Sequence, residues 1–570
     1  MRSPVAAVAS VLLAGSLVLS GCSSSSSKDE PSPKTSQSPT GSTSAKTPAE
    51  TALPSTAWRT AEPADVAQGG TLRLAAATLP KNFNPLQSDA ADSDAARILA
   101  PTTGSAVRIT ADGGWEVDPD YAKSVEVTDE NPLTVKVELN PKAVWQGGTA
   151  ITAQDMIAFW KAQNGSNDDY QVISTAGYDN ISAITVGKDK FTYAVTFKEP
   201  TAEWQQYVYP RLAANVSASP KLFNKAFRSR AISSNGPFVV TSIDRTKGLI
   251  TQEPNPRWWG DPPKLDKITW NIADPSVQAE AYVNDELDAV DLQASTYDTA
   301  KDTGTIQRAA GVDWSQVTLN GGRGPLADVN VRRAVARAID RGPIATMAAK
   351  PLGAPAAPLG SLLLVPGQQG YRNAARQISH DPAAARALLA DAGYTAGADG
   401  KVTKDGKPLE LTMPVPDGTP ANAARADAIA KDLAKIGITV TQRPVPAATF
   451  FDDVVIPLDF DLVTFMRRAS PFPVAAAEPF YFPLDSPQNY TGIGPARFAT
   501  GFATVLGTLD ENLLLRRISK LDEWLMAEAP VVPLAVTPTV VGVRGGLVNY
   551  GAAQFEQPDW ASVGFVTKKK

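Results

Sequence analysis

The stretch that most constrains the fold of this chain is residues 235–270, NGPFVVTSIDRTKGLITQEPNPRWWGDPPKLDKITW. It opens with a Gly-Pro turn and continues as two extended segments on either side of Lys247-Gly248. Asn-Pro and Asp-Pro-Pro breaks then precede a last extended segment. This punctuation predicts a β-rich scaffold. We expect the adjacent Trp258 and Trp259 to pack against the core, because large aromatic side chains serve packing more often than ligand binding.

The N-terminus is typical of an exported protein. Arg2 precedes an apolar run over residues 5–19 that is too short for a permanent membrane span, so residues 1–21 are predicted to be a signal peptide. The segment ends in Leu-Ser-Gly-Cys, which resembles the bacterial lipobox, and Cys22 is the only cysteine among 570 residues. One cysteine excludes an intrachain disulfide and a thiolate metal site, and its position predicts lipidation.

Residues 22–65 consist largely of Ser, Thr, Pro, Ala and Lys, with very few large apolar side chains. Such a segment cannot bury enough surface to offset its conformational entropy, so it is predicted to be a disordered tether. About 500 residues follow the tether, which is more than one hydrophobic core usually serves. We therefore expect two or more lobes.

The composition disfavours several classes of function. The chain has 54 basic and 59 acidic residues spread without a basic stripe, so nucleic acid is not an expected partner. His380 is the only histidine and has no cysteine partner, so no metal, cofactor or Ser-His-Asp triad is expected. No nucleophile elbow occurs, and no Ser-x-x-Lys motif follows the predicted tether, which disfavours a hydrolase. We expect a protein that is not an enzyme.

Hydrophobic periodicity predicts both strands and helices. Alternating apolar residues over 133–139 and 191–197 indicate two strands with an amphipathic helix between them. Helices are predicted within residues 325–350 and over 381–393, where capping residues mark the ends. Residues 409–445 outline a βαβ unit, and this predicts parallel strands.

Two charged clusters are interpreted as solvated surface features. The carboxylates of Asp285 and Asp288 could serve acid–base chemistry or a cation, but a solvated helix end explains them more simply. Arg332 and Arg333 could bind an anion, but on the polar face of a predicted helix we expect them to face water.

Several motifs occur in the order of one known family. They are Gly-Pro-Phe at residues 236–238, Asn-Pro-Arg-Trp-Trp-Gly at 255–260, Ala-Ile-Asp-Arg at 338–341 and Leu-Leu-Ala-Asp-Ala-Gly-Tyr at 388–394. On these motifs the chain, from residue 69 to about 560, resembles the family 5 extracellular solute-binding proteins. These are the peptide-binding lipoproteins of ABC importers.

The resemblance implies an α/β fold of the periplasmic-binding-protein kind, type II and of the large cluster. Two lobes and an extra third domain then surround a central cleft, and segments near residues 300–325 and 525–540 join the lobes. The implied bounds are residues 66–117, 226–320 and 536–570 for lobe I, 118–225 for domain II, and 321–535 for lobe III.

The resemblance also implies candidate ligand-lining residues in several separate parts of the chain. These are Asp89, in a loop expected to reach into the cleft, and the aromatic residues Tyr170, Tyr178 and Phe450. Without the family, Asp89 belongs to a polar surface loop, and Tyr170 and Tyr178 are as well explained as half-buried surface aromatics.

Residues 459–473 align with the strand and loop that line the family's cleft. Peptide binders of the family carry Trp where this chain has Arg467, and Asp where it has Ser470. That Asp pairs with the peptide's ammonium group, so its absence removes a reason to hold a free N-terminus. Arg467 and Arg468 instead favour an anionic group, and Phe472 completes the candidate site.

The implied function is an extracytoplasmic, lipid-anchored and monomeric receptor that binds a peptide or small polar ligand and delivers it to the permease subunits of an ABC importer. The alternative is a non-transport lipoprotein that acts as an interaction module in cell-envelope assembly. Three further motifs are Asn-Pro-Lys-Ala-Val-Trp at residues 140–145, Gly-Tyr-Asp at 177–179 and Ser-Pro-Phe-Pro at 470–473. On these motifs the chain also resembles an actinobacterial subgroup of the family that includes a mycobacterial lipoprotein linked to phosphatidylinositol mannoside and lipoarabinomannan synthesis.

Overall fold

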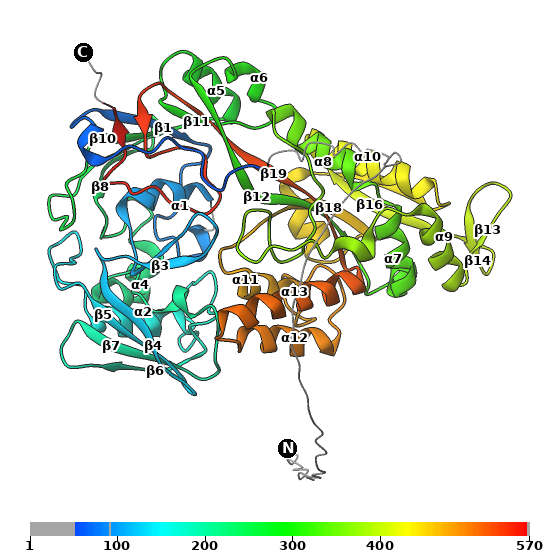
Figure 1. Ribbon diagram of the computed structural model, residues 1–570, viewed down its shortest axis with the longest axis horizontal. Helices are drawn as coiled ribbons and strands as arrows, with labels where there is room; N and C mark the ends of the chain where they lie inside the picture. The colour runs from blue at the N-terminus through cyan, green and yellow to red at the C-terminus, as the bar shows by residue number, and fades with distance from the viewer. Residues whose placement is uncertain (1–51, 91–92, 567–570) are drawn as a thin grey trace, which may run out of the picture. The chain divides into compact units, whose positions relative to one another are not determined.

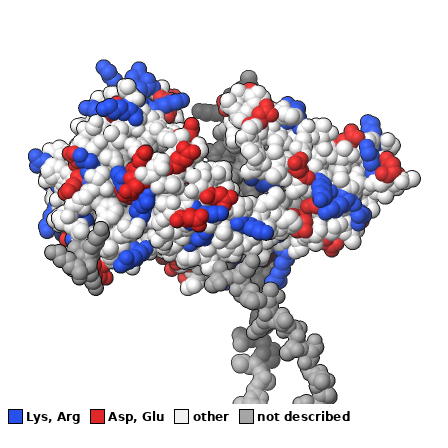
Figure 2. Space-filling view, turned by 90° about the horizontal axis from the view of Figure 1, so that it is seen from above, with Lys and Arg blue, Asp and Glu red and all other residues white. Residues whose placement is uncertain are grey.

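The computed structural model describes residues 52–90 and 93–566. The predicted signal peptide, Cys22 and the tether as far as residue 51 lie outside the described residues. Within the described ranges, no helix has both the length and the apolar character needed to cross a membrane. Lys and Arg are interspersed with Asp and Glu over the face shown in Figure 2.

A four-stranded sheet forms the scaffold predicted from residues 235–270. Its order is β1 (Thr71–Ala76), β10 (Lys267–Ile272), β9 (Leu249–Pro254) and β8 (Phe238–Asp244). β1 is parallel to β10, whereas β10, β9 and β8 are antiparallel to one another. The predicted β-rich scaffold is therefore confirmed, and it joins strands that lie far apart in the sequence.

The two adjacent tryptophans pack against the core beside this sheet, as predicted. The ring centres of Trp258 and Trp259 are 4.6 Å apart with the rings tilted by 42°, and both rings contact Tyr121. The indole N–H of Trp258 donates to the carbonyl of Asp261 at 3.0 Å, and that of Trp259 to the carbonyl of Asp120 at 2.6 Å. Their polar atoms are thus satisfied by the protein itself.

A second four-stranded sheet has the order β4 (Ala122–Glu130), β5 (Leu133–Leu139), β7 (Thr192–Phe197) and β6 (Ile181–Val186). Alternate residues of β5 are buried, which confirms the predicted period of two. The helix between β5 and β7 is α2 (Ala153–Gln163), where the Asp155 carboxylate accepts a hydrogen bond from the Thr152 N–H at 2.8 Å.

Two long strands connect the halves of the described body. β12 (Thr305–Leu319) and β19 (Val531–Val543) pair antiparallel and run together across the centre of Figure 1. Their sheet has the order β11 (Ala289–Asp291), β19, β12 and β18 (Leu462–Arg468). β18 is therefore an edge strand whose outer side has no strand partner in this sheet.

The predicted βαβ unit is confirmed in the third region of the chain. β16 (Glu410–Pro416) and β17 (Thr439–Val445) are parallel, with α10 (Pro420–Ala434) between them. The predicted helices are α7 (Val329–Ala338) and α9 (Pro382–Asp391), and each has an aspartate side chain as its N-cap. The bounds of the three domains stay a prediction.

The other helices and strands flank these elements. They are α1 (Ser93–Leu99), α3 (Ala214–Ser217), α4 (Pro220–Lys225), α5 (Pro275–Val283), α6 (Tyr297–Ala300), α8 (Arg341–Ala349), α11 (Pro473–Tyr481), α12 (Ala496–Leu506), α13 (Glu511–Glu528), β2 (Val107–Ile109), β3 (Trp115–Val117), β13 (Thr395–Ala396), β14 (Val402–Lys404), β15 (Lys407–Pro408), β20 (Leu547–Val548) and β21 (Gly564–Phe565).

The predicted tether is wrong over residues 52–65, which lie along the folded body. The N–H of Ala57 donates to the carbonyl of Ala552 at 2.9 Å, and the carbonyl of Pro54 accepts from Ala310 at 2.8 Å. The half-buried Trp58 accounts for the difference, because it gives this end of the segment apolar surface to bury.

The expectation of solvated charges is wrong at Arg332 and Asp288. The Arg332 side chain is only 3% exposed and forms an ion pair with Glu528 at 3.0 Å. Asp288 is 5% exposed and accepts from the guanidinium of Arg73 at 2.7 Å. A helical pattern identifies which face a residue occupies, but not whether another element later covers that face. Arg333 is half-buried.

Candidate ligand site at the junction of the lobes

The region after β7 meets the third region of the chain through a carboxylate at a helix end. Glu203 is 5% exposed, and its two carboxylate oxygens accept hydrogen bonds from the backbone N–H groups of Val474 and Ala475, each at 2.8 Å. These amides open α11, where unpaired N–H groups and the helix dipole favour a negative charge. We call this contact between Glu203 and α11 the junction.

Glu203 has no positively charged partner among the described residues. Burial raises the pKa of its carboxyl to about 7, and the nearby Glu478 adds to that rise. The two backbone hydrogen bonds at the start of α11 act in the opposite direction. The carboxyl of Glu203 therefore titrates near neutral pH while the junction is formed.

Arg467 occupies the other side of α11. It lies near the end of β18, directly opposite Trp314 of β12. Its guanidinium carbon is 3.6 Å from the ring centre of Phe480, 5.3 Å from that of Trp314 and 5.8 Å from that of Tyr481. The side chain is half-buried, and its Nη1 donates to the Tyr481 hydroxyl at 3.4 Å. Arg467 thus sits in an aromatic cage built by β12 and α11.

No carboxylate lies within ion-pair distance of Arg467 among the residues that the structure describes. Burial lowers the pKa of its guanidinium, while the hydroxyls of Tyr481 and Tyr490 counteract that change. The guanidinium remains charged at neutral pH, because its ordinary pKa is far above 7. Its neighbours are therefore aromatic rings and hydroxyls rather than an opposite charge.

The neighbouring Arg468 has a different environment. Its side chain is 62% exposed and lies 3.5 Å from the carboxylate of Asp313. Burial raises the pKa of the Asp313 carboxyl, and Arg468 lowers it. Of the two arginines predicted to face the ligand, Arg468 has a carboxylate partner and Arg467 does not.

Ser470 and Phe472 shape the turn into α11. The Ser470 hydroxyl accepts a hydrogen bond from the Phe472 N–H at 3.0 Å, and its carbonyl accepts from Gln368 at 2.8 Å. Phe472 is the half-buried N-cap residue of α11. Both residues thus lie next to the amides that Glu203 holds.

Phe450 is 4% exposed and belongs to an apolar cluster at the base of β18. Its neighbour Phe451 is 43% exposed and packs edge-on against Phe465 and Tyr490. Tyr490 in turn contacts Phe480 of the aromatic cage. The aromatic surface that leads toward Arg467 is therefore provided by Phe451 more than by Phe450.

Asp89 and Tyr170 lie in neighbouring loops, and both are engaged with the protein. The Asp89 carboxylate pairs with Arg228 at 2.7 Å. The Tyr170 hydroxyl donates to the carbonyl of Ser217 at 2.7 Å, and its ring packs edge-on against Phe223. Their ligand-binding role stays a prediction.

Tyr178 is 7% exposed and lies within the core of the β4–β7 region. Its ring packs edge-on against Phe159 and Tyr207. Burial raises the pKa of the Tyr207 hydroxyl, and Glu203 contributes to the rise. Tyr178 is thus close to the junction but has little surface left for a ligand, and its binding role stays a prediction.

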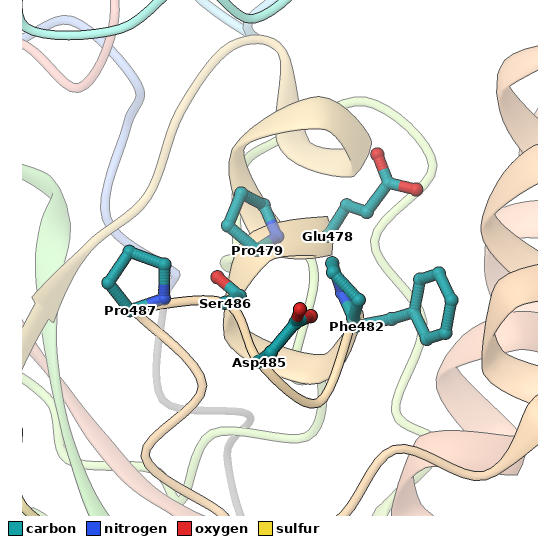
Figure 3. A pocket seen from close by; sticks show the side chains of 7 residues that line it. Glu478, Pro479, Phe482, Asp485, Ser486 and Pro487 are labelled. Carbon is teal, nitrogen blue, oxygen red and sulfur yellow. The ribbon is translucent and has the colours of Figure 1, made fainter. Parts of the chain in front are cut away.

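An open cavity of about 390 Å³ lies beyond the last turns of α11 (Figure 3). Its lining contains the carboxyl groups of Glu478 and Asp485 together with three prolines. Burial raises the pKa of the Glu478 carboxyl. None of the predicted ligand-lining residues borders this cavity, and the described residues contain no group of His, Asp and Glu that could hold a metal ion.

Sequence reasoning did not select several residues of the junction and of the aromatic surroundings of Arg467. They are Glu203, Trp314, Phe480, Tyr481 and Tyr490. Only Glu203 had a local signal, since it is an acidic residue inside the otherwise uncharged run 201–209. The aromatic residues come together because β12, α11 and the following loop meet in space.

Two α/β regions joined by long crossing strands, with a buried contact between them, form the architecture expected of a bilobal solute-binding protein. A comparison with protein families agrees: residues 116–490 match the family described as "Bacterial extracellular solute-binding proteins, family 5 Middle". The chain belongs to this family, as the sequence motifs indicated.

Relatives cover most of the chain. It is 32% identical over 516 residues to "Oligopeptide-binding protein OppA" of Mycobacterium tuberculosis, an alignment that spans 89% of this chain and 86% of the relative. It is 26% identical over 429 residues to "Probable monoacyl phosphatidylinositol tetramannoside-binding protein LpqW" of the same species, spanning 68% and 66%. The predicted likeness to an actinobacterial subgroup is confirmed.

Solved structures show the same fold. "Periplasmic EDTA-binding protein EppA" has a TM-score of 0.80 and 25% identity, covering 90% of this chain and 99% of its own. The oligopeptide-binding protein AppA from Bacillus subtilis, in complex with a nonapeptide, has a TM-score of 0.70 and 18% identity, covering 88% and 100%. With its membership of family 5, the protein is a solute-binding component of the kind that serves ABC importers.

Proposed function

We propose that this protein binds peptides at the junction of its lobes and delivers them to the permease of an ABC importer. The observation that carries the proposal is the 32% identity to an oligopeptide-binding protein over 89% of the chain. The position of β18 at the edge of its sheet supports it, because an extended peptide can add to a sheet at an edge strand. Backbone pairing of this kind tolerates many side chains.

The junction supplies a mechanism for ligand capture. Glu203 on one side and the amides of α11 on the other are already in contact at 2.8 Å. A ligand that contacts both lobes stabilises the closed form only to the extent that it binds the closed form more tightly than the open form. The permease then distinguishes the loaded protein by its closed lobes.

Mass spectrometry of the native protein, purified from its own cells and then denatured, tests the peptide proposal. We expect a series of short peptide masses in the released fraction. Co-purified glycolipids without peptides contradict the proposal, and so does a preparation that neither carries nor takes up peptides from a defined tetrapeptide mixture. The mass of the intact native protein, measured before denaturation, tests our further proposal that the protein is a monomer.

A second candidate function is a non-transport role in assembling envelope glycolipids. Two observations favour it: the likeness to the mannoside-binding lipoprotein, and Ser470 where peptide binders carry an aspartate. Under this proposal, released masses correspond to phosphorylated glycolipids. Deletion of the gene then alters mannosylated lipids without impairing growth on peptides.

We also propose that diacylation of Cys22 anchors the protein to the outer face of the cell membrane, and that the protein has no catalytic activity. Support for the anchor comes from the apolar run and the Leu-Ser-Gly-Cys ending that precede the tether. A Cys22→Ser variant should leave the membrane fraction and appear in the medium. Retention of the variant in the membrane fraction contradicts the anchor.

A further inference from the structure

Arg467 is a partly desolvated positive charge whose protein surroundings do not neutralise it. The described residues offer its guanidinium three aromatic rings and one hydroxyl acceptor, and no carboxylate. Desolvation of a charge is unfavourable unless an opposite charge or several hydrogen bonds offset it. Elsewhere in the same region, Arg332 is offset by Glu528.

The geometry of the cage leaves the hydrogen-bonding edge of the guanidinium available. A guanidinium has five N–H donors in its plane, and Tyr481 accepts from one of the Arg467 nitrogens. Phe480, with its ring centre 3.6 Å from the guanidinium carbon, lies over the group. The remaining in-plane donors have no acceptor among the described residues. This arrangement matches the fork that binds planar oxyanions through two parallel hydrogen bonds.

Two tyrosine hydroxyls and an aromatic row extend the site. Tyr481 and Tyr490 both interact electrostatically with Arg467. Tyr490 lies 6.3 Å from Phe480 and 6.4 Å from Phe451, measured between ring centres. Phe451 is 43% exposed, which is unusual for a phenylalanine beside a buried cluster. A ligand at Arg467 therefore finds flat apolar surface next to it.

We propose that Arg467, held by the buried hydroxyl of Tyr481 and assisted by the hydroxyl of Tyr490, binds an oxyanion of the ligand, and that the row from Phe480 through Tyr490 to Phe451 holds an apolar or aromatic group attached to it. The inference rests on the proposed function, because it names the chemistry of the ligand that the solute-binding site takes. A peptide supplies such an anion as its terminal carboxylate, and a glycolipid supplies it as phosphate.

Arg468 does not share this role, although it is adjacent in the sequence. It is solvent-exposed and lies 3.5 Å from Asp313. Its charge is thus already compensated and screened by water. This difference provides a control variant with the same change in formal charge.

The test uses the full-length protein and three small probes: 3-phenylpropionate, its neutral amide 3-phenylpropionamide, and phenyl phosphate. Titration calorimetry gives a dissociation constant for each. We expect the wild type to bind 3-phenylpropionate at least about tenfold more tightly than the amide, because only the acid forms charge-assisted hydrogen bonds. Arg467→Met should reduce this ratio to about one, whereas Arg468→Met should leave it unchanged.

Three results would each overturn the inference. They are equal binding of acid and amide by the wild type, failure of the wild type to bind either anion, and an Arg467→Met variant that keeps the same ratio of amide to acid dissociation constants as the wild type. Circular dichroism checks that the variants are folded. If Arg467→Met does not fold, Arg467→Lys replaces it, since lysine keeps the charge but lacks the planar fork. A ratio lowered at least about threefold in Arg467→Lys then supports the inference, and an unchanged ratio overturns it.

The probes also separate this inference from the proposed function. Peptides that co-purify with a protein showing no acid preference leave the peptide proposal intact and overturn the anion site. An Arg467-dependent acid preference in a protein that neither carries nor takes up peptides supports the anion site and contradicts the peptide proposal. Tighter binding of phenyl phosphate than of 3-phenylpropionate assigns the anion as phosphate, and the reverse order assigns it as carboxylate.

Discussion

Buried charged groups occur both at the contact between α7 and α13 and around α11. They differ in whether an opposite charge lies beside them. At the first, Arg332 pairs with Glu528 and donates to the carbonyls of Leu326 and Ala327 at 2.9 and 3.1 Å. At the second, Arg467 has no carboxylate among the described residues. The first arrangement is complete within the protein, whereas the second has hydrogen-bonding capacity left for a ligand.

Glu203 extends this comparison to a negative charge. Like Arg467 it lies at the junction, and like Arg467 it has no opposite charge among the described residues. Both of these charges lie against α11, although Arg425 and Asp522 are also buried without an opposite charge among the described residues. Burial of a charge therefore does not by itself indicate a functional site. The partners of the charged group must be identified as well.

The largest effect should follow from Arg332→Met. The substitution leaves the carbonyls of Leu326, Ala327 and Glu528 without their donor, while Arg497 still contacts the Glu528 carboxylate. We expect the free energy of unfolding to fall by about 3 kcal/mol, measured by urea denaturation. Arg333→Met is the matched control, because Arg333 makes one hydrogen bond, to Ala527. Equal losses in both variants contradict the comparison.

The next effect concerns pH and Glu203. Its folded-state pKa of about 7 lies above the ordinary 4.5, so the folded protein holds this proton more tightly than the unfolded chain does. Stability contributed by the protonated group is complete below about pH 4.5 and is lost as the pH rises toward 7. The wild type should therefore lose about 2 kcal/mol relative to Glu203→Gln between pH 5 and pH 8.

Paired thermal unfolding of the wild type and Glu203→Gln at the two pH values measures this difference, and contributions from other titrating groups cancel in it. The charged groups to consider near Glu203 are Glu478 and the hydroxyl of Tyr207. A pH-independent difference between the two proteins shows that Glu203 keeps an ordinary pKa, and the junction is then not buried in solution.

A smaller effect on stability is expected for Arg467→Met. The variant loses the contacts with Phe480 and Trp314, but it no longer desolvates a charge. The two changes oppose each other, so the free energy of unfolding should change by less than about 1 kcal/mol. A loss as large as that of Arg332→Met in urea denaturation means that Arg467 is a structural residue.

The smallest effect is expected for Arg468→Ala. The ion pair with Asp313 joins side chains that are 62% and 44% exposed, and such pairs contribute little because water screens them. We expect a change within about 0.5 kcal/mol in the same denaturation assay. A larger loss, abolished by high salt, contradicts the view that this pair is a surface feature.

Local sequence patterns predicted much of the fold. Alternation in residues 133–139, caps at the starts of α7 and α9, and the βαβ outline of 409–445 all reappear in the structure. These features depend on residues close in the chain, so their physical causes are visible in the sequence. Two predictions were wrong: that the tether continues beyond residue 51, and that Arg332 is solvated. In both cases packing against residues distant in the sequence determines the structure.

The candidate site could be predicted only in part. The sequence alone established the acidic, cysteine-poor composition and the order of the family motifs, and it predicted export and a cleft-lining position for Arg467. Only the tertiary structure distinguished Arg467 from Arg468 and brought Glu203 to α11. Residues 203 and 474 are far apart in the chain, and whether a charge is paired depends on which atoms lie within a few ångströms of it. That distance is fixed by packing rather than by any local pattern.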